Sequence, residues 1–314
     1  MSDAQFGRKA SLVVVEGTKG LDLSNLRFRF KTTQQDVESP NTATIRVYNL
    51  KPETVKSIRG EYSRVVLQAG YEGNYGVIFE GTIRQFRIGR ENGTDTYLDI
   101  LAADGDIPYN WSVCNKTLAK GWTQEQAIKE AADAMVKLGA QTGFTDVNGL
   151  MGGTVPNPRG KVMWGLAKAH LRASMATTHA SWNIANGQIN VVALDGYLPG
   201  AAVVLTSETG LIGRPEQTNE GIRVRCLLNP RIVVGKLVKI DNKSVNQTVN
   251  QNPNAAPGPA FDRYQGVQLL ASVTADGIYR VYVAEHDGDT RGQAWYSDLM
   301  VLAVNADTKK VVCK

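Results

Sequence analysis

Alternation of hydrophobic and polar residues is the strongest pattern in the chain. From Ile222 to Leu228, apolar residues occupy every second position and two arginines lie between them. Leu26–Lys31 alternates in the same way. A period of two is that of a β-strand with one buried face. Similar short runs predict further strands at Leu12–Glu16, Thr44–Leu50, Val65–Tyr71, Val77–Phe79, Thr82–Gly89, Tyr97–Ala103, Ala201–Leu205, Gly210–Arg214, Lys236–Asp241, Ile278–Ala284 and Trp295–Val304.

Two long hairpins are predicted among these strands. The first turns around Glu91-Asn92-Gly93, and the apolar phase shifts between Ile83 and Phe86, which predicts a β-bulge there. The second starts at Tyr264-Gln265-Gly266 and turns at Asp276-Gly277. We expect Glu285–Asp289 to form the closing turn after its return strand.

Helical periodicity is confined mainly to the middle of the chain. Thr123–Leu138 carries an apolar stripe at helical spacing, with Thr123 and Gln126 at the positions of a capping box and Gly139 at the C-terminal end. Val162–Ala173 predicts a second, weaker helix, and Pro52–Ile58 a short one with proline in its first turn.

A β-hairpin is predicted at Ser181–Val192. Asn186-Gly187 is the dipeptide typical of a two-residue hairpin turn, and this turn places Ile184 opposite Ile189 and Trp182 opposite Val191. Two helices against this hairpin predict a small α+β unit in the middle of a mainly β chain.

The strand-rich regions on either side of this unit contain similar short sequence segments in the same order. Ile45-Arg46-Val47 matches Ile222-Arg223-Val224, and Leu50 matches Leu227. The later matches are Pro52 with Pro230, Phe79-Glu80-Gly81 with Tyr264-Gln265-Gly266, and Asp104-Gly105-Asp106 with Asp287-Gly288-Asp289. The repeat predicts two related β-barrels flanking the helical unit.

Composition and charge disfavour several function classes but do not identify the function. The formal net charge is only +5 and no run of Lys and Arg occurs, so a nucleic-acid-binding surface is disfavoured. Cys114, Cys226 and Cys313 fit no metal-ligand spacing, and Cys226 lies on the apolar face of a strand. No apolar run is long enough for a signal peptide or a membrane span, so we expect synthesis and folding in a reducing cytoplasm.

Candidate chemistry is sparse. His286-Asp287-Gly288-Asp289 could contribute to a metal or acid–base site, but the segment that matches it in the first region, Asp104-Gly105-Asp106, has no preceding histidine. His170 and His179 are expected to be packing or surface residues. Gly149–Gly153 has no Lys-Ser/Thr of a phosphate-binding loop. We therefore predict no catalytic, cofactor-binding or metal-binding residue.

Two blocks resemble the baseplate hub proteins of contractile-tailed bacteriophages. These are GLIGRPEQTNEGIRVRCLLNPRIVVGKLVKID, from Gly210, and YRVYVAEHDGDTRGQAWYSDL, from Tyr279. The hairpin SWNIANGQINVV is also similar, and the resemblance extends from about Thr123 to Val304. It implies two tail-tube-like β-barrels per chain and a ring of three chains that adapts a sixfold tail tube to a threefold spike. Larger relatives carry an extra domain where this chain has only the loop Asn242–Pro259, which places in doubt any contact made through that domain.

The resulting prediction is a non-enzymatic virion protein. It has a first barrel at 1–106, an α+β unit at 107–197, a second barrel at 198–305 with a flexible loop at 242–262, and a tail at 306–314. The implied partners are two further copies, the tail-tube protein, the central spike, and the baseplate wedge and tape-measure proteins. Genomic DNA would only pass through, no cofactor is implied, and assembly would occur in the host cytoplasm.

Two other function classes stay open at this point. A cell-envelope-degrading enzyme of the tail tip would need paired carboxylates across a cleft, which sequence cannot show. A carbohydrate-binding module would need an exposed aromatic platform, and Trp164, Trp182 and Trp295 are better explained as core or interface residues.

Overall fold

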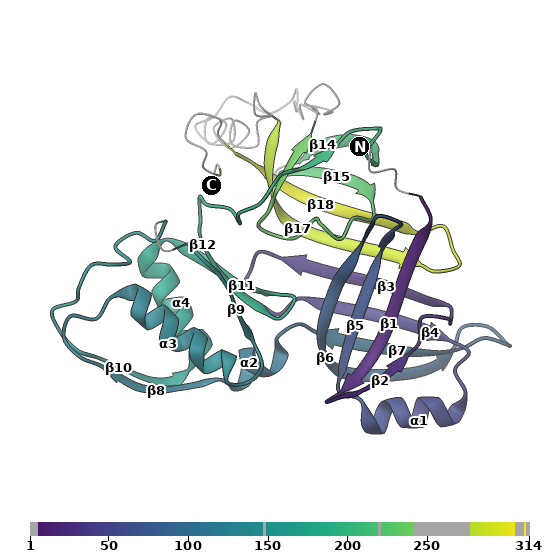
Figure 1. Ribbon diagram of the computed structural model, residues 1–314, viewed down its shortest axis with the longest axis horizontal. Coiled ribbons are helices and arrows are strands. Elements are labelled where there is room, and N and C mark those ends of the chain that lie inside the picture. The colour runs from purple at the N-terminus through teal and green to yellow at the C-terminus, as the bar shows by residue number, and fades with distance from the viewer. Residues whose placement is uncertain (1–5, 147–148, 219–220, 241–276, 305–310, 312–314) are drawn as a thin grey trace, which may run out of the picture.

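The computed structural model describes residues 6–146, 149–218, 221–240, 277–304 and 311, and its elements are mostly strands (Figure 1). The strands before the middle helices are β1 Arg8–Glu16, β2 Lys19–Asp22, β3 Phe28–Gln35, β4 Thr42–Tyr48, β5 Arg64–Tyr71, β6 Asn74–Arg90 and β7 Thr96–Ala103, and helix α1 is Pro52–Glu61. The strands after them are β13 Val203–Leu205, β14 Leu211–Thr218, β15 Gly221–Leu227, β16 Leu237–Ile240, β17 Ile278–Asp289 and β18 Trp295–Ala303. We call β1–β7 the first strand set and β13–β18 the second strand set.

One sheet of 13 described strands contains both sets. Its order is β14-β15-β18-β17-β3-β4-β7-β6-β5-β1-β2, with β16 paired to β17 and β13 paired to β16. The two sets meet where β17 pairs with β3, from Val283 opposite Gln35 to Asp289 opposite Arg29. We call this pairing the seam.

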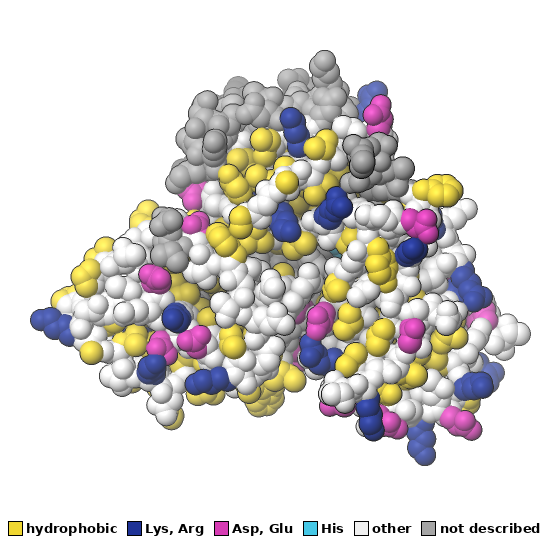
Figure 2. All heavy atoms as spheres, in the orientation of Figure 1, with side chains coloured by type: hydrophobic (Ala, Val, Ile, Leu, Met, Phe, Trp, Pro, Cys, Tyr) yellow, Lys and Arg dark blue, Asp and Glu magenta, His cyan; other side chains and the backbone are white. Residues whose placement is uncertain are grey.

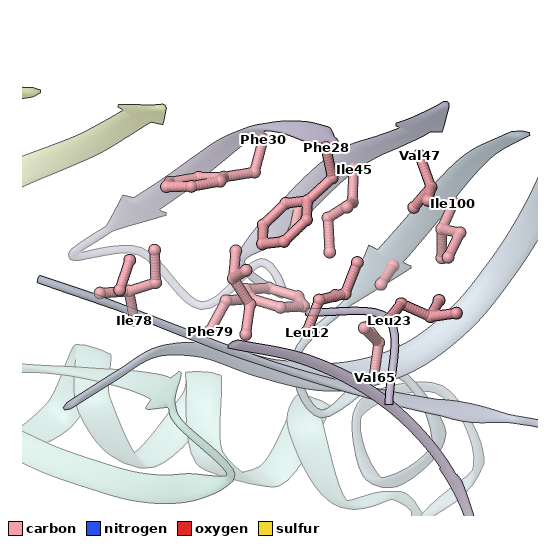
Figure 3. Packing of buried hydrophobic residues seen from close by; sticks show 14 of the residues in the cluster. Leu12, Leu23, Phe28, Phe30, Ile45, Val47, Val65, Ile78, Phe79 and Ile100 are labelled. Atoms are coloured by element: carbon pink, nitrogen blue, oxygen red, sulfur yellow. The ribbon is translucent and has the colours of Figure 1, made fainter. Parts of the chain in front are cut away.

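The alternation in the sequence explains how the first strand set packs. In β3, Phe28 and Phe30 are buried while Arg29 and Lys31 are exposed. Figure 3 shows these rings and Ile45 facing Leu12 and Phe79 from the opposite side of the curled sheet. β3 and β2 are the two outermost strands of the first strand set. They do not pair with each other to close the curled sheet in the described chain, because β17 is paired with the outer edge of β3.

The second strand set repeats the strand order of the first. β14-β15-β18-β17-β16 has the same order in space and along the chain as β3-β4-β7-β6-β5. All these neighbours pair antiparallel in both sets. The sets differ at the next strand, since β13 runs parallel to β16 whereas β1 runs antiparallel to β5.

A bulge recurs at the same point of this order. The register between β6 and β7 shifts between Ile83 and Gln85, which confirms the predicted bulge. The register between β17 and β18 shifts in the same way between Val281 and Val283. One extra residue bends a long strand, so the strand can separate at that point from the strand it paired with before the bulge. β6 leaves β5 at Thr82, and β17 leaves β16 at Arg280.

The middle of the chain forms a separate core. Its elements are α2 Asp106–Trp111, β8 Val113–Leu118, α3 Gln124–Val136, β9 Gln141–Thr145, β10 Lys161–Leu166, α4 Ala167–Thr178, β11 Ala180–Ala185 and β12 Gln188–Ala193. The capping box of Thr123 and Gln126 is present, and Gly139 has a φ of 99°, as its C-terminal position requires. The β11–β12 hairpin turns at Asn186-Gly187 and pairs Ile184 with Ile189, as predicted.

Two sequence-based predictions are wrong. Residues 162–166 are not helical, because they form β10, which pairs with β8 and precedes α4. Glu285–Asp289 is not a turn, because these residues continue β17 along both β18 and β3.

The last match of the predicted repeat is also wrong. Asp104 follows β7, but Asp287 lies in β17, whose counterpart in the strand order is β6. The loop at 242–262 and the Tyr264-Gln265-Gly266 match lie outside the described residues. No helix in the described ranges is long and apolar enough to span a membrane.

Candidate assembly surface

One continuous polar face crosses the seam and joins both strand sets. It consists of the side chains that point away from the two cores, and we call it the charged face. Its charged members on six neighbouring strands are Arg223, Arg225, Asp298, Glu285, Asp287, Asp289, Arg29, Lys31, Arg46 and Asp99. Arg87 extends the face onto β6, opposite Asp99. Alternation alone produces this face, because each of these strands buries its other side.

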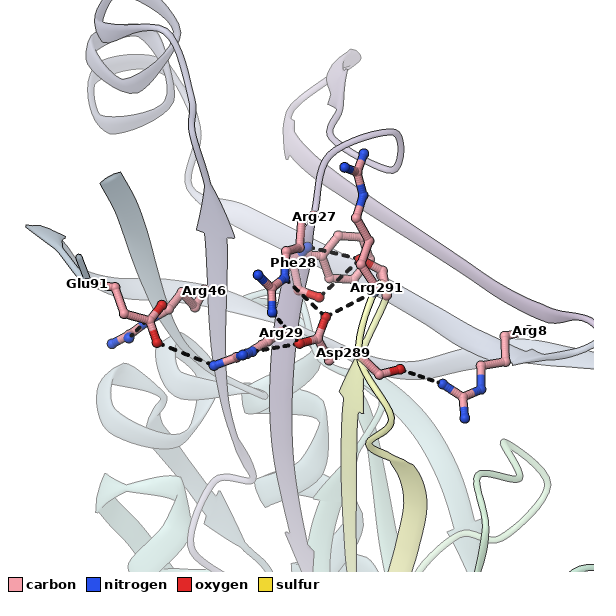
Figure 4. Close-up of polar contacts among 10 residues, drawn as sticks. Arg8, Arg27, Phe28, Arg29, Arg46, Glu91, Asp289 and Arg291 are labelled. Carbon is pink, nitrogen blue, oxygen red and sulfur yellow. Dashed lines mark hydrogen bonds and ion pairs between the residues drawn. The ribbon is translucent and has the colours of Figure 1, made fainter. Parts of the chain in front are cut away.

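Asp289 lies at one end of the seam, where it contacts several arginines (Figure 4). Its carboxylate accepts hydrogen bonds from Arg27, which directly precedes β3, at 2.9 Å and from Arg29 of β3 at 2.7 Å. The backbone N–H of Arg291 donates a third bond at 2.9 Å. Burial acts to raise the pKa of Asp289, but these hydrogen bonds outweigh it and hold the pKa well below its usual range. Asp289 is therefore an anion that binds the two strand sets together.

Three further ion pairs on this face join neighbouring strands. Lys31 contacts Glu285 across the seam at 3.1 Å. Arg46 donates to Asp99 at 2.7 and 3.0 Å, and its guanidinium lies 3.9 Å from the centre of the Tyr97 ring. The hydrogen bond to Asp99 raises the pKa of Arg46 above its ordinary value.

Arg225 and Asp298 form the equivalent cross-strand pair in the second strand set. Their two hydrogen bonds measure 2.6 and 2.9 Å. Basic residues on β15, β3 and β4 are balanced by acidic residues on β18, β17 and β7, so the face has little net charge for its size. Figure 2 shows a similar mixture of both signs on the side of the molecule that it displays.

A buried polar junction connects the strand sets to the middle of the chain. Arg280 of β17 is 3% exposed and pairs with Asp36, which follows β3. The same guanidinium donates to the carbonyl oxygens of Leu194 and Gly196, at 3.2 and 2.8 Å. Asn183 of β11 donates to the other carboxylate oxygen of Asp36 at 2.8 Å. The Arg280–Asp36 ion pair and its hydrogen bonds thus connect β17, the end of β3 and the β11–β12 region.

Asp104 forms a second buried contact with the middle hairpin. Its carboxylate accepts a 2.9 Å bond from the backbone N–H of Gly187, in the Asn186-Gly187 turn. Burial raises the pKa of Asp104 to about 7, although this bond acts in the opposite direction. Gly105 has a φ of 67°, and a Cβ there would lie 2.7 Å from the side chain of Ile184. Close packing and backbone conformation therefore both require glycine at this position.

His286 and its acidic neighbours do not converge into a site. His286 points into the core and its Nδ1 lies 2.7 Å from the Ser297 hydroxyl, whereas Asp287 and Asp289 lie on the opposite, charged face. Burial lowers the pKa of His286 to about 4. Within the described residues, no group of three His, Cys, Asp or Glu side chains could hold a metal ion.

The other residues considered in the sequence are not brought together. His170 lies in α4 and His179 caps the end of that helix with a φ of 50°. Cys114 and Cys226 are free and buried, while Cys313 lies outside the described residues. Gly149–Gly153 is a turn beside Asp146.

The tryptophans separate into two classes. Trp182 and Trp295 are buried, as expected of core residues, but Trp164 is 71% exposed. Trp164 lies on the outer face of the two-stranded β8–β10 sheet, beside exposed Val162. This apolar face is a second surface that the chain leaves uncovered in the described residues.

Two solved structures with the same fold are tail proteins, and one of them comes from a prophage. The 43 kDa tail protein of prophage MuSo2 from Shewanella oneidensis superposes with a TM-score of 0.58, covering 96% of this chain and 99% of its own at 7% identity. A tail protein from Neisseria meningitidis MC58 gives a TM-score of 0.54 over 94% and 96% of the two chains, at 11% identity. The chain has the fold of phage tail proteins.

The fold also occurs in a Francisella protein complex. A chain of the Francisella PdpA–VgrG complex has a TM-score of 0.54 over 94% of this chain and 57% of its own, at 6% identity. No protein-family profile matches the sequence, and no curated protein matches it by sequence. At these identities the similarity lies in the strand arrangement and not in shared residues.

Sequence reasoning missed the seam and the buried junction. Arg29 and Lys31 are visible as the polar half of an alternating strand, but their partners Asp289 and Glu285 lie more than 250 residues away. A weak signal did exist, because three acidic residues occupy alternate positions from Glu285 to Asp289. Such a row is typical of one face of a strand, and it would have predicted β17 in place of a turn.

Proposed function

We propose that the chain is a structural hub subunit of the baseplate of a contractile phage tail. In this proposal three copies form a ring that joins a sixfold tail tube to a threefold central spike. The observation that carries it is the strand order found twice in one chain and joined by the seam. Three copies would present six similar strand sets, which is the match that such an adaptor requires.

The proposed units follow the two strand sets and the middle core. A first tube-like barrel at 1–106 and a second at 198–305 would flank the α+β unit at 107–197. Each of the three regions has a hydrophobic cluster centred on its own residues, which supports this division, and Leu228 and Trp295 of the third region join the cluster of the first. The barrels would form the ring, and the α+β unit would lie outside it.

The charged face is the proposed wall of the channel. It is continuous over both strand sets, and its paired charges give no strong attraction for phosphate. DNA would therefore pass without being held, which agrees with a structural role and not a catalytic one. The proposed partners are the tube, spike, wedge and tape-measure proteins of a virion assembled in the host cytoplasm.

Deletion of the gene in a phage or prophage that encodes it tests this function. We expect the deletion to stop tail assembly at the baseplate, and electron microscopy should show no complete tails. Complementation with the full chain should restore them, and labelled chain should appear at the tube–spike junction. Normal infectious tails without the protein would contradict the proposal.

A further inference from the structure

A groove lies where the core face of the first strand set extends beyond helix α1. Its volume is about 510 Å³, and its apolar lining includes Leu50 and Val55 at the helix and Ile88 and Leu98 on β6 and β7. Leu98 is buried, but Ile88, which lies opposite it in the sheet, is 56% exposed. We call this the α1 groove. It leaves part of the apolar core face open to solvent.

Ile88 also lies on a free strand edge. After its bulge, β6 from Gln85 to Arg90 pairs only with β7 among the described strands. An exposed apolar residue on an unpaired edge favours association with another strand. The groove and the edge meet at Ile88, so a single ligand can contact both.

The second strand set shows that the equivalent edge accepts a strand. The first paired residues after the two bulges are Gln85 and Val283. Counted from them, Ile88 corresponds to His286, which is 1% exposed where β3 pairs with β17. The same half of β6 therefore has the geometry to receive a strand, and it receives none in the described chain.

The exposed charges around the groove and the edge are basic. Lys56 and Arg59 are the charged residues among those that line the groove. Arg87 and Arg90 lie on the free half of β6. None of these four side chains forms an ion pair within the described ranges.

The acidic residues beside this edge already have partners. Asp99 lies opposite Arg87, but it accepts hydrogen bonds from Arg46 at 2.7 and 3.0 Å. Glu91 follows β6 and contacts Arg29 at 3.4 Å. The four basic side chains thus favour an acidic ligand from outside the described chain.

We infer that the α1 groove and the free half of β6 together bind an extended acidic segment of a partner protein. The segment adds as a strand beside Gln85–Arg90, and its backbone bonds to β6 supply affinity. An apolar side chain of the segment enters the groove beside Ile88, and its Asp or Glu side chains pair with the four basic residues. The contact does not depend on the hub function, because it requires only the first strand set.

The seam provides an internal precedent for this charge pairing. Counted from the bulges, Arg87 corresponds to Glu285, which contacts Lys31 of β3 at 3.1 Å. At the seam the long strand carries the acid and the strand beside it carries the base. On β6 the sign is reversed, so the added strand is expected to carry the acid. Opposite charges on adjacent strands stabilise a sheet.

Binding of a short fluorescein-labelled peptide to the full-length chain tests the inference. In this peptide Glu alternates with Val and Leu, and the control peptide has Lys in place of Glu. Fluorescence anisotropy should show saturable binding of the acidic peptide and at least roughly tenfold weaker binding of the basic one. Bound acidic peptide should also slow amide hydrogen exchange over residues 85–90, because a paired strand protects the edge.

Substitutions test the two parts of the site. Arg87→Glu should weaken binding of the acidic peptide roughly tenfold, and Lys56→Glu combined with Arg59→Glu should have a similar effect. Ile88→Asp should weaken it about a hundredfold, because it places a carboxylate in an apolar groove that binds an acidic segment. Lys129→Glu makes the same charge change on exposed α3 and is the matched control, with an expected effect below about twofold. Thermal melts should show that each variant is folded.

Three results would overturn the inference. One is the absence of saturable binding of the acidic peptide below about 1 mM. Another is binding that leaves exchange over residues 85–90 unchanged or that tolerates Ile88→Asp, since the peptide would then bind elsewhere. The third is a free chain in which a second copy already protects residues 85–90 and excludes the peptide. The hub proposal has a separate test, because none of these results changes the outcome expected of the gene deletion.

Discussion

The two strand sets share an order of pairing but are built from different side chains. The first set packs Phe28, Phe30 and Phe79 in its centre, and its core also receives Trp295 from the second set. The core of the second set is mainly aliphatic, and Tyr279 is its only buried aromatic residue in the described chain. Strand order and the position of the bulge are thus retained where residue identity is not. What defines this fold is which strands are neighbours, and many apolar combinations can fill the space between them.

The connections between equivalent strands differ as well. Helix α1 joins β4 to β5 in the first set, whereas β15 and β16 are joined by a short non-helical segment that contains Pro230. α1 covers the outside of the first set, where its Ile58 is fully buried. The second set uses its corresponding region, through Gly235 and Leu198, to contact the chain leaving the middle unit. The segment that connects these equivalent strands therefore differs between the two sets, according to what it packs against.

Trp295→Ala should give the largest effect, because one side chain from the second set completes the core of the first. Its ring packs edge-on against Phe30 at 5.5 Å between centroids, and its indole N–H donates to the Gly70 carbonyl oxygen. We expect a loss of about 4–6 kcal/mol of unfolding free energy, measured by urea denaturation. The same substitution at exposed Trp164 should change it by less than about 0.5 kcal/mol. Equal effects at the two sites would mean that the sets do not share a core.

Arg280→Ala should give the next largest effect. It leaves Asp36 buried without its ion-pair partner, a change that costs about 3–5 kcal/mol. Arg225→Ala removes an exposed pair of similar geometry and should cost at most about 1 kcal/mol. Replacing both Arg280 and Asp36 with apolar residues should recover part of the loss. If Arg280→Ala lowers the free energy of unfolding no more than Arg225→Ala does, the buried junction does not hold the three parts of the chain together.

Asp104→Asn should remove a pH dependence located at the end of the first set. The folded state holds a proton on Asp104 up to about pH 7, while the unfolded chain releases it near pH 4. This group therefore makes the wild type progressively less stable as pH rises from about 4 to about 7. Relative to the wild type, the Asn variant should gain on the order of 2 kcal/mol over that interval, as shown by urea midpoints at pH 4.5 and 7.5. A constant difference across the two pH values would contradict the assignment.

His286→Asn should remove a dependence of the opposite sign in the second set. The folded-state pKa of His286 is lowered to about 4, so the unfolded chain takes up its proton first as pH falls below about 6.5. The wild type should therefore lose stability from this group between pH 6.5 and 4, and the variant should not. Differences between variant and wild type isolate each group, because all other titrations are common to both proteins.

Ile45→Val and Ile222→Val should give the smallest effects. Both isoleucines are buried, Ile45 in β4 and Ile222 in the equivalent strand β15, and each truncation should cost about 0.5–1.5 kcal/mol. Similar values would indicate that the equivalent strands are packed equally well. A difference greater than about 1 kcal/mol would show that the two cores tolerate lost volume differently, and thermal unfolding can measure it.

Local patterns predict most of the strands but not how the sets are joined. The bulge near Ile83 and the turn at Asn186-Gly187 could be predicted because a few adjacent residues determine them. Residues 162–166 were assigned to a helix because a short apolar run has no decisive period, and pairing with β8 then determined a strand. The bonds from Arg27 and Arg29 to Asp289 depend on pairing between strands far apart in the chain, which no local pattern encodes.

The seam has a consequence for how the protein is made. Arg29 and Asp289 are separated by 260 residues. At about 5–20 residues per second, the ribosome needs roughly 13–50 seconds between adding the first and adding the second. During that time the nascent first set lacks Trp295, and β3 is an unpaired edge. Exposed Arg29 and Lys31 on that edge oppose premature pairing with other nascent chains. Completion of the chain thus controls when the large sheet can form.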